Sequence, residues 1–424
     1  MTSLRVRLAL LGLALLAGGL AAPVPASAAA SAGATALPHT PEEQSLDGAV
    51  PQEILRRSGF DTVATEFADS LDHADSYERA RLIVALEGTG LWRKAVDRAQ
   101  GRGPSGGDLS RDDDRPLYWA RLGMTRELRT WEPGFPLTAD QRRTVLNELE
   151  ETSRGQNGVH YPQDRSVKRI LVTGFDPFEL FLDARKSNPS GAAALALDGT
   201  VIRTADGPAR IETVMFPVRW EDFTDGAVER ALRPHLPNID LFTTLSQGRP
   251  GRFDLERTNG AWRGGYVDNL IVSRTGTIPV AEPGTQPQWT TTTLPSAAVV
   301  AAGTEPLPVY DNTEVSEIPA GGTRTVVRPE GPTPGSTARE GGGGDYLSNE
   351  IAYRATLLRD RLGLHDTLPG GHLHTPVLKF GPENSHPETG TVTDPTFVEN
   401  RAGIIAQTRA ILAAAINATQ RPRD

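Results

Sequence analysis

The second half of the chain predicts an α/β fold. Three short apolar runs of β type, at 169–178, 209–218 and 239–248, follow one another along the chain. A helical pattern lies between the second and the third run, at 220–236. Alternating strands and helices are typical of a sheet whose strands are joined by helical crossovers. We therefore expect one such sheet in this half of the protein.

The first 28 residues have the pattern of a secretory signal peptide. Arg5 and Arg7 precede an apolar run that ends near residue 22, and residues 26–28 read Ala-Ser-Ala, a cleavage pattern. The run is short for a membrane-spanning helix, and an uncleaved anchor is the alternative. We expect cleavage after Ala28 and a secreted, soluble protein with no membrane segment after cleavage.

Two further segments precede the predicted sheet. Residues 29–50 are rich in Ala, Ser, Pro and Thr, which is typical of a flexible linker. Residues 51–165 have a mainly helical pattern, and capping-box sequences at 75–78 and 138–141 precede two of its helical runs. We expect a helical accessory region over 51–165, followed by an α/β domain over 166–424.

The remaining elements of the α/β domain follow the same reasoning. Residues 271–340 are rich in Thr, Pro and Gly and are expected to be largely loop, with room for one edge hairpin. A late strand is predicted at 374–380. Apolar residues at a spacing of three and four predict a C-terminal helix at 396–420.

Charge and cysteine content exclude several kinds of chemistry. The formal net charge is −9, which argues against a general nucleic-acid binder. None of the 424 residues is cysteine. The protein therefore has no disulfide, no thiol nucleophile and no thiolate metal site.

Four glycines at 341–344 precede Ser348 and a helical pattern. Glycines before a helix let backbone N–H groups approach a ligand closely. Ser348 is either a nucleophile or the N-cap of the helix, and Asp345 competes for the capping role. If Asp345 caps the helix, Ser348 lies in the first turn with its hydroxyl available, near a positive helix end that suits an oxyanion.

Four motifs resemble those of the pyroglutamyl peptidase I family, also called pyrrolidone-carboxylate peptidases. In chain order they are LVTGFDPF with a following NPS (171–178 and 188–190), SQGRPGRFDLERTNG (246–260), GGDYLSN (343–349) and GGHLHTPVL (370–378). The resemblance covers about 168–415. It implies a three-layer α/β/α core of phosphorylase/hydrolase type with a mixed sheet. It also implies hydrolysis that removes an N-terminal pyroglutamate from peptides, without a metal or an organic cofactor.

The resemblance implies a Ser-His-Glu catalytic site. Ser348 stands where the family has a cysteine nucleophile. His374 would be the general base and then the acid, and Glu256 would orient and charge-stabilise His374. The hydroxyl is a far weaker acid than a thiol and needs a base in tight geometry. Glu256 and His374 are both retained, and serine resists oxidation outside the cell.

The resemblance also implies a substrate pocket. Phe175 and Phe178 would line it, because aromatic walls suit a flat, uncharged lactam ring. Gln247 and Gly248 would belong to a loop whose backbone contacts the lactam amide. Glu179 begins a Glu-Leu-Phe sequence where the family usually has glycines, so the rim of the pocket is expected to differ.

Other interpretations of the same residues stay open. The two phenylalanines could be core aromatics, and Glu256 could be a surface carboxylate beside Arg257. His372 and His374 lie two apart on one strand face and could form a metal pair, with His365 or an acid as third ligand.

The whole protein likewise has alternative functions. It could be an inactive relative that binds pyroglutamyl or other small amide ends, or an amidase or esterase of other specificity. The expected partner is a peptide with an N-terminal pyroglutamate, and the resemblance also implies a homo-oligomer. The helical region 51–165 has no counterpart in the family core.

Overall fold

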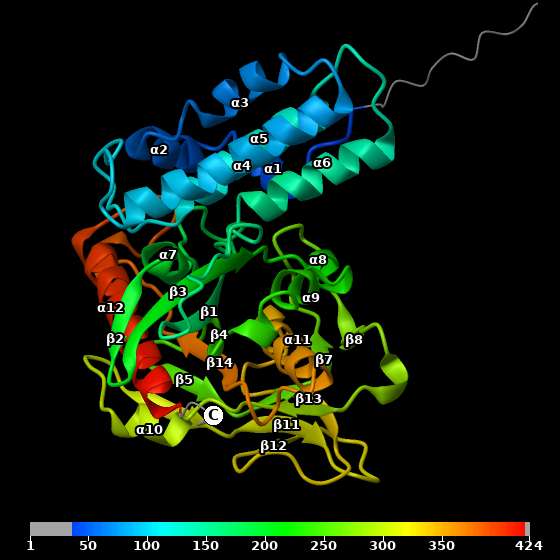
Figure 1. The fold of residues 1–424 in the computed structure, drawn as a ribbon, viewed down its shortest axis with the longest axis vertical. Helices are drawn as coiled ribbons and strands as arrows, with labels where there is room; N and C mark the ends of the chain where they lie inside the picture. The colour runs from blue at the N-terminus through cyan, green and yellow to red at the C-terminus, as the bar shows by residue number, and fades with distance from the viewer. Residues whose placement is uncertain (1–35, 420–424) are drawn as a thin grey trace, which may run out of the picture.

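The computed structural model describes residues 36–419, which form a helical region and an α/β region (Figure 1). The predicted signal peptide lies outside the described residues. The helical region precedes a mixed sheet covered by helices, so the predicted fold class is confirmed. Its helices are α1 (Pro41–Ser45), α2 (Ala49–Ser58), α3 (Val63–Leu71), α4 (Tyr77–Ala99), α5 (Arg115–Thr130) and α6 (Ala139–Thr152).

Local capping explains where three of these helices begin. The predicted capping box at 138–141 is confirmed for α6, whereas Ser76 caps α4 without a reciprocal glutamate, because Arg79 occupies the third helical position. Helix α1 begins inside the segment expected to be a flexible linker. Thr40 and Glu43 form a capping box around it, and Pro41 presets its first turn.

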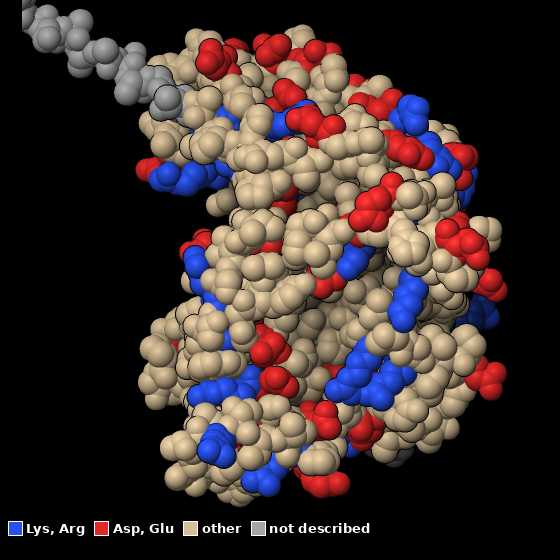
Figure 2. Space-filling model, turned by 180° about the vertical axis from the view of Figure 1, so that it is seen from behind, with Lys and Arg blue, Asp and Glu red and all other residues tan. Residues whose placement is uncertain are grey.

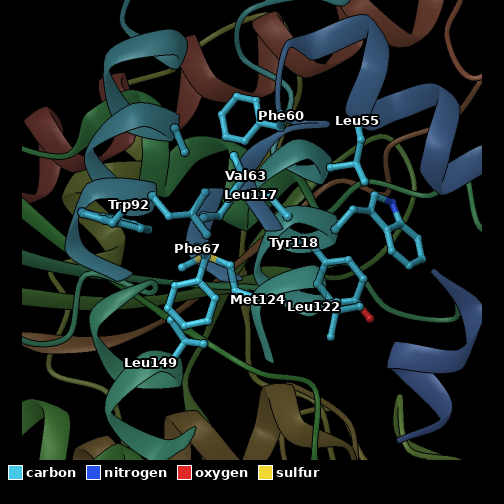
Figure 3. Packing of buried hydrophobic residues seen from close by; sticks show 14 of the residues in the cluster. Leu55, Phe60, Val63, Phe67, Trp92, Leu117, Tyr118, Leu122, Met124 and Leu149 are labelled. Atoms are coloured by element: carbon cyan, nitrogen blue, oxygen red, sulfur yellow. The ribbon is translucent and has the colours of Figure 1, made fainter. Parts of the chain in front are cut away.

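The helical region has its own apolar core, which α2 to α6 surround (Figure 3). Phe60 and Phe67 pack there with side chains from α4 and α5, and Leu149 of α6 belongs to the same cluster. The cluster continues into the α/β region through Ala194, Leu195 and Met215. The two regions therefore share buried apolar surface.

The main sheet has seven strands in the order β10-β5-β14-β4-β1-β3-β2. Its four central strands, β14, β4, β1 and β3, are mutually parallel, while β5 is antiparallel to β14 and β2 is antiparallel to β3. The bounds are β1 (Lys168–Phe175), β2 (Val201–Thr204), β3 (Gly207–Phe216), β4 (Leu241–Gln247), β5 (Phe253–Glu256), β10 (Val309–Asn312) and β14 (Gly370–Thr375).

Helices cover both faces of this sheet, which gives three layers (Figure 1). Successive side chains of a strand point to opposite faces. On β1, Ile170 and Val172 accordingly pack with α7 (Pro189–Leu197) and α12 (Pro395–Ala418). Leu171 packs on the other face with α8 (Trp220–Thr224), α9 (Ala227–Leu232) and α11 (Leu347–Arg361).

Three predicted elements differ from the structure. The helix expected at 220–236 is broken between α8 and α9 at Gly226, which has a φ of 77°. The strand expected at 374–380 is instead β14, which ends before Pro376 because proline cannot donate to a ladder. Residues 271–340 hold more than one hairpin, including β10 and a separate sheet of β11 (Val315–Ile318), β12 (Val326–Arg328) and β13 (Thr337–Glu340).

Charges of both signs are interspersed over the face that Figure 2 shows. Among residues 36–419, no helix combines the length and the apolar character that crossing a membrane requires.

Candidate active site

A buried histidine–carboxylate pair joins β14 and β5. His374 Nδ1 lies 2.7 Å from Glu256 Oε1, and the side chain of Asn312 donates to Glu256 Oε2 at 2.6 Å. Glu256 is only 1% exposed, so it is not the surface carboxylate of the alternative interpretation. Because an ionised carboxylate can only accept, its bond places a proton on Nδ1 and leaves Nε2 of His374 as the basic nitrogen.

Two glycines let the backbone approach this pair. A Cβ atom at Gly342 would lie 2.1 Å from Glu256 Oε2, and a Cβ atom at Gly248 would lie 2.6 Å from the Cγ of His374. Next along the glycine run, a Cβ at Gly343 would lie 3.1 Å from the backbone nitrogen of Asn349. The run therefore connects the carboxylate of the pair to the start of α11.

Ser348 is the second residue of α11, and its hydroxyl does not cap the helix. The N-cap is Tyr346, which makes no capping bond through its side chain, so neither Ser348 nor Asp345 has the expected capping role. The side chain of Asn349 accepts from the backbone N–H of Gly260 and donates to its carbonyl, both at 2.8 Å. These bonds fix the first turn, in which Ser348 is half-buried.

Ser348 lines a small hollow together with three of the other predicted site residues, Phe175, Phe178 and Gln247. The hollow has an empty volume of about 260 Å³ including its mouth. Phe175 is buried and stacks on Phe223, whereas Phe178 lies with its ring centroid 6.2 Å from that of Tyr346. The rest of the wall comprises Asn188, Val218, Ser246, Tyr346 and Leu347.

Gly248 has a different position from Gln247. Its N–H donates to the carbonyl of Thr375 at 2.8 Å, and its Cα faces the His374 ring. Gly248 therefore supports the catalytic histidine candidate, and Gln247 is the member of this pair that reaches the hollow.

Ser348 and His374 are not joined by a hydrogen bond in the described part of the chain, where the closest bonded partner of His374 is Glu256. A serine nucleophile needs its base within about 2.6–3.2 Å in the substrate complex, and such bonds are often longer before substrate binds. The structure thus places Glu256 and His374 together, and Ser348 lies in the wall of the nearby hollow.

His372 is held by two hydroxyl groups. Its Nδ1 lies 2.7 Å from Thr244 Oγ1 and its Nε2 lies 2.8 Å from Ser246 Oγ. Burial, with a smaller contribution from His374, lowers the pKa of His372 well below its ordinary value. No group of three or more metal-ligating side chains occurs within residues 36–419, and His365 instead bonds to Asp360. The metal-pair interpretation of His372 and His374 therefore has no ligand set here.

Buried ion pairs attach the helical region to the wall of the hollow. Asp176, between Phe175 and Pro177, accepts from Arg121 Nη2 at 2.5 Å and from Arg154 Nη2 at 2.7 Å. All three charged side chains are buried. The sequence motif gave no sign that Asp176 forms buried ion pairs. Its partners, Arg121 and Arg154, lie in the helical region, which has no counterpart in the family that the motifs resemble.

Two more contacts of the helical region reach the same loops. Asp114, at the start of α5, accepts from the backbone N–H of Asn188 at 2.9 Å and from the hydroxyl of Ser187. Glu42 of α1 accepts from the side chain of Asn269, which also donates to the carbonyl of Pro177. The helical region is thus bonded to the pocket loops at several points.

Asp114 gives the protein a predicted pH dependence of stability. Burial, and then the neighbouring charge of Asp113, raises the pKa of Asp114 to about 6 from 3.8. Between these two pKa values the folded state holds a proton that the unfolded state has released. The stability that this proton contributes is fully present below pH 3.8 and is lost as the pH rises through about 6. We expect Asp114→Asn to raise the free energy of unfolding at pH 7.5 by up to about 3 kcal/mol.

Urea unfolding at pH 4.5 and pH 7.5 checks this. The advantage of Asp114→Asn over the wild type should shrink at the lower pH. A variant less stable than the wild type at pH 7.5 would show that the ionised carboxylate is the better partner for Asn188.

The fold and the site together define an α/β protein with a buried histidine–carboxylate pair beside a small aromatic hollow. The family model described as the PA0049 N-terminal domain matches residues 24–150, and that of the PA0049 C-terminal domain matches 169–285 and 308–379. The chain belongs to this family. The uncharacterized protein PA0049 of Pseudomonas aeruginosa is 33% identical to it, over 87% of this chain and 84% of PA0049.

Solved structures of pyroglutamyl peptidases are also similar. Pyroglutamyl peptidase I of Bacillus amyloliquefaciens is 20% identical, with a TM-score of 0.40, and the match covers 60% of this chain and 100% of that one. A mutant pyrrolidone carboxyl peptidase of Pyrococcus furiosus is 22% identical, with a TM-score of 0.40, over 58% of this chain and 97% of that one.

Proposed function

We propose that this protein is a secreted hydrolase that removes N-terminal pyroglutamate, or a similar small amide, from peptides through Ser348, His374 and Glu256. The observation that carries the proposal is the buried bond between Glu256 and His374, beside the glycine run that leads to Ser348. The four sequence motifs supply the order of the groups.

The reaction is amide hydrolysis through an acyl-enzyme. Ser348 Oγ attacks the scissile carbonyl while Nε2 of His374 takes the hydroxyl proton. The tetrahedral oxyanion forms near the first turn of α11, whose leading N–H groups have no intrahelical acceptor. His374 then protonates the leaving amine, and water hydrolyses the ester on Ser348 with His374 again as base.

The aromatic walls of the hollow support a small, flat ring as the acyl group. Phe175 and Phe178 provide apolar surface, and Gln247 ends the strand beside them. The hollow is small, since its empty volume of about 260 Å³ includes the open space at its mouth.

A binding module is the second candidate, since Ser348 and His374 share no hydrogen bond in the described residues. Such a protein would hold a pyroglutamyl end in the same hollow and leave it intact. It would need neither Ser348 nor His374 for affinity.

Hydrolysis of a fluorogenic pyroglutamyl amide tests the proposal. The matched control is the prolyl amide with the same leaving group, because its ring has the same size but carries a charged amine and no lactam carbonyl. We expect turnover of the pyroglutamyl amide alone. Absence of turnover, with saturable binding of the same compound, would overturn the hydrolase and leave the binding module.

A further inference from the structure

We infer that Asn312 is a positioning residue, whose side-chain amide holds Glu256 in the orientation that keeps a proton on Nδ1 of His374. The inference rests on the proposed function, because it gives Asn312 a part in the Ser-His-Glu site. Asn312 does not line the hollow, and it bonds to Glu256 rather than to His374. It therefore acts through the carboxylate.

Asn312 lies beside Glu256 at the edge of the main sheet. It is the last residue of the edge strand β10, and it is the Cα partner of Glu256 in the parallel pairing of β10 with β5. Partner residues project from the same face of a sheet. Asn312 is half-buried, whereas Glu256 is 1% exposed. The sheet thus brings an amide to a carboxylate that water hardly reaches.

Chemistry determines the direction of the bond between these two side chains. Nδ2 of Asn312 lies 2.6 Å from Glu256 Oε2. An ionised carboxylate only accepts, so the amide faces Glu256 with its nitrogen and not with its oxygen. The other carboxylate oxygen, Oε1, lies 2.7 Å from Nδ1 of His374. In the described part of the chain, Asn312 is the donor that occupies Oε2.

Loss of this amide would disturb His374. A buried carboxylate oxygen without a donor costs free energy, so Glu256 would turn toward water or another donor. Its bond to Nδ1 of His374 would then loosen. The proposed reaction needs Nε2 as the unprotonated nitrogen, and the proton fixed on Nδ1 is what makes it so.

The same amide also reaches the glycine run. Nδ2 of Asn312 lies 3.4 Å from the carbonyl oxygen of Gly342. Gly341 and Gly344 bond to each other in both directions at 2.9 Å, so the run forms a tight turn that leads to Ser348. One side chain thus contacts both the carboxylate of the pair and the turn that precedes the proposed nucleophile.

A purely structural role of Asn312 is the alternative. Its Oδ1 accepts from the backbone N–H of Glu314 at 3.4 Å, a local bond typical of an Asx turn at the end of a strand. A role of this kind predicts that loss of Asn312 lowers stability and leaves the Nδ1 proton of His374 unchanged.

Exchange of that proton with water distinguishes the two roles. The full chain is prepared with isotope-labelled histidine and followed by NMR, and His374→Gln assigns the resonance. We expect a protected Nδ1 proton in the wild type and exchange at least about tenfold faster in Asn312→Val. Valine suits an edge strand, and Asn312→Ala is a second variant. In both, kcat for the pyroglutamyl amide should fall at least about tenfold with KM nearly unchanged.

Asp311→Asn is the matched control. It changes the preceding residue of the same strand, whose carboxylate accepts from Arg257 Nη2 at 2.8 Å, and it should leave the exchange rate as in the wild type. A wild type without a protected Nδ1 proton, or Asn312 variants that exchange at the wild-type rate, would overturn the inference. Failure of both variants to fold would do so too, because the role of Asn312 would then be structural.

The outcome is separable from that of the proposed function. Faster exchange in Asn312→Val, in a protein that does not hydrolyse the pyroglutamyl amide, would retain the positioning of Glu256 by Asn312 and reject the hydrolase. Turnover of the amide with an exchange rate independent of Asn312 would do the reverse.

Discussion

Ser348→Ala is expected to lower the turnover of a pyroglutamyl amide at least about 10³-fold, because it removes the attacking oxygen. The variant should fold normally, since the Ser348 hydroxyl does not cap α11 and Tyr346 is the N-cap. It should also still bind the substrate, because Phe175, Phe178 and Gln247 remain. The measurement is kcat and KM beside a thermal unfolding curve.

Ser348→Cys is the companion variant. A thiol has a pKa of about 8.5 and is a stronger nucleophile than a hydroxyl at neutral pH, so this variant should retain turnover. Wild-type inactivity together with activity of Ser348→Cys would mean an intact site whose nucleophile is disabled. Full activity of Ser348→Ala would contradict the role of Ser348.

Asp176→Asn is expected to lower the free energy of unfolding by about 3–5 kcal/mol, because it leaves the buried guanidinium of Arg121 without its counter-charge and removes one of the two carboxylates that pair with Arg154. Arg121 and Arg154 come from the helical region, so the same change should loosen its attachment to the loop that holds Phe175 and Phe178. Activity should fall through a higher KM. Urea unfolding and steady-state kinetics measure the two effects.

Asp108→Asn is the matched control for that experiment. Asp108 also bonds to an arginine, Arg57 Nε at 2.8 Å, but its side chain is 69% exposed. Its loss should lower the free energy of unfolding far less, because exposed ion pairs contribute little to stability. Equal effects of the two substitutions would show that burial of the Asp176 pairs adds nothing to stability.

Much of the geometry of the candidate site could be predicted because of the sheet. Phe175, Gln247 and His374 lie at or near the carboxyl ends of β1, β4 and β14. These strands are parallel, so their ends meet at one edge although the residues are far apart in sequence. The apolar runs that mark β1, β3 and β4 are strong signals, since these strands are covered on both faces.

Other features had no signal in the sequence. Arg121, Arg154 and Asp176 look like solvated charges, because a charge on a helix or in a loop does not reveal its burial. Residues 271–340 read as loop, since the segment is rich in Thr, Pro and Gly and its strands are only three or four residues long.

Trapping the acyl-enzyme tests the central claim most directly. The full chain would be incubated with an activated pyroglutamyl ester, quenched in acid, digested and examined by mass spectrometry. The account predicts a pyroglutamyl group on the peptide that contains Ser348, and less of it in a Glu256→Gln variant. An unmodified Ser348, or modification of a different residue with Ser348 unchanged, would contradict it.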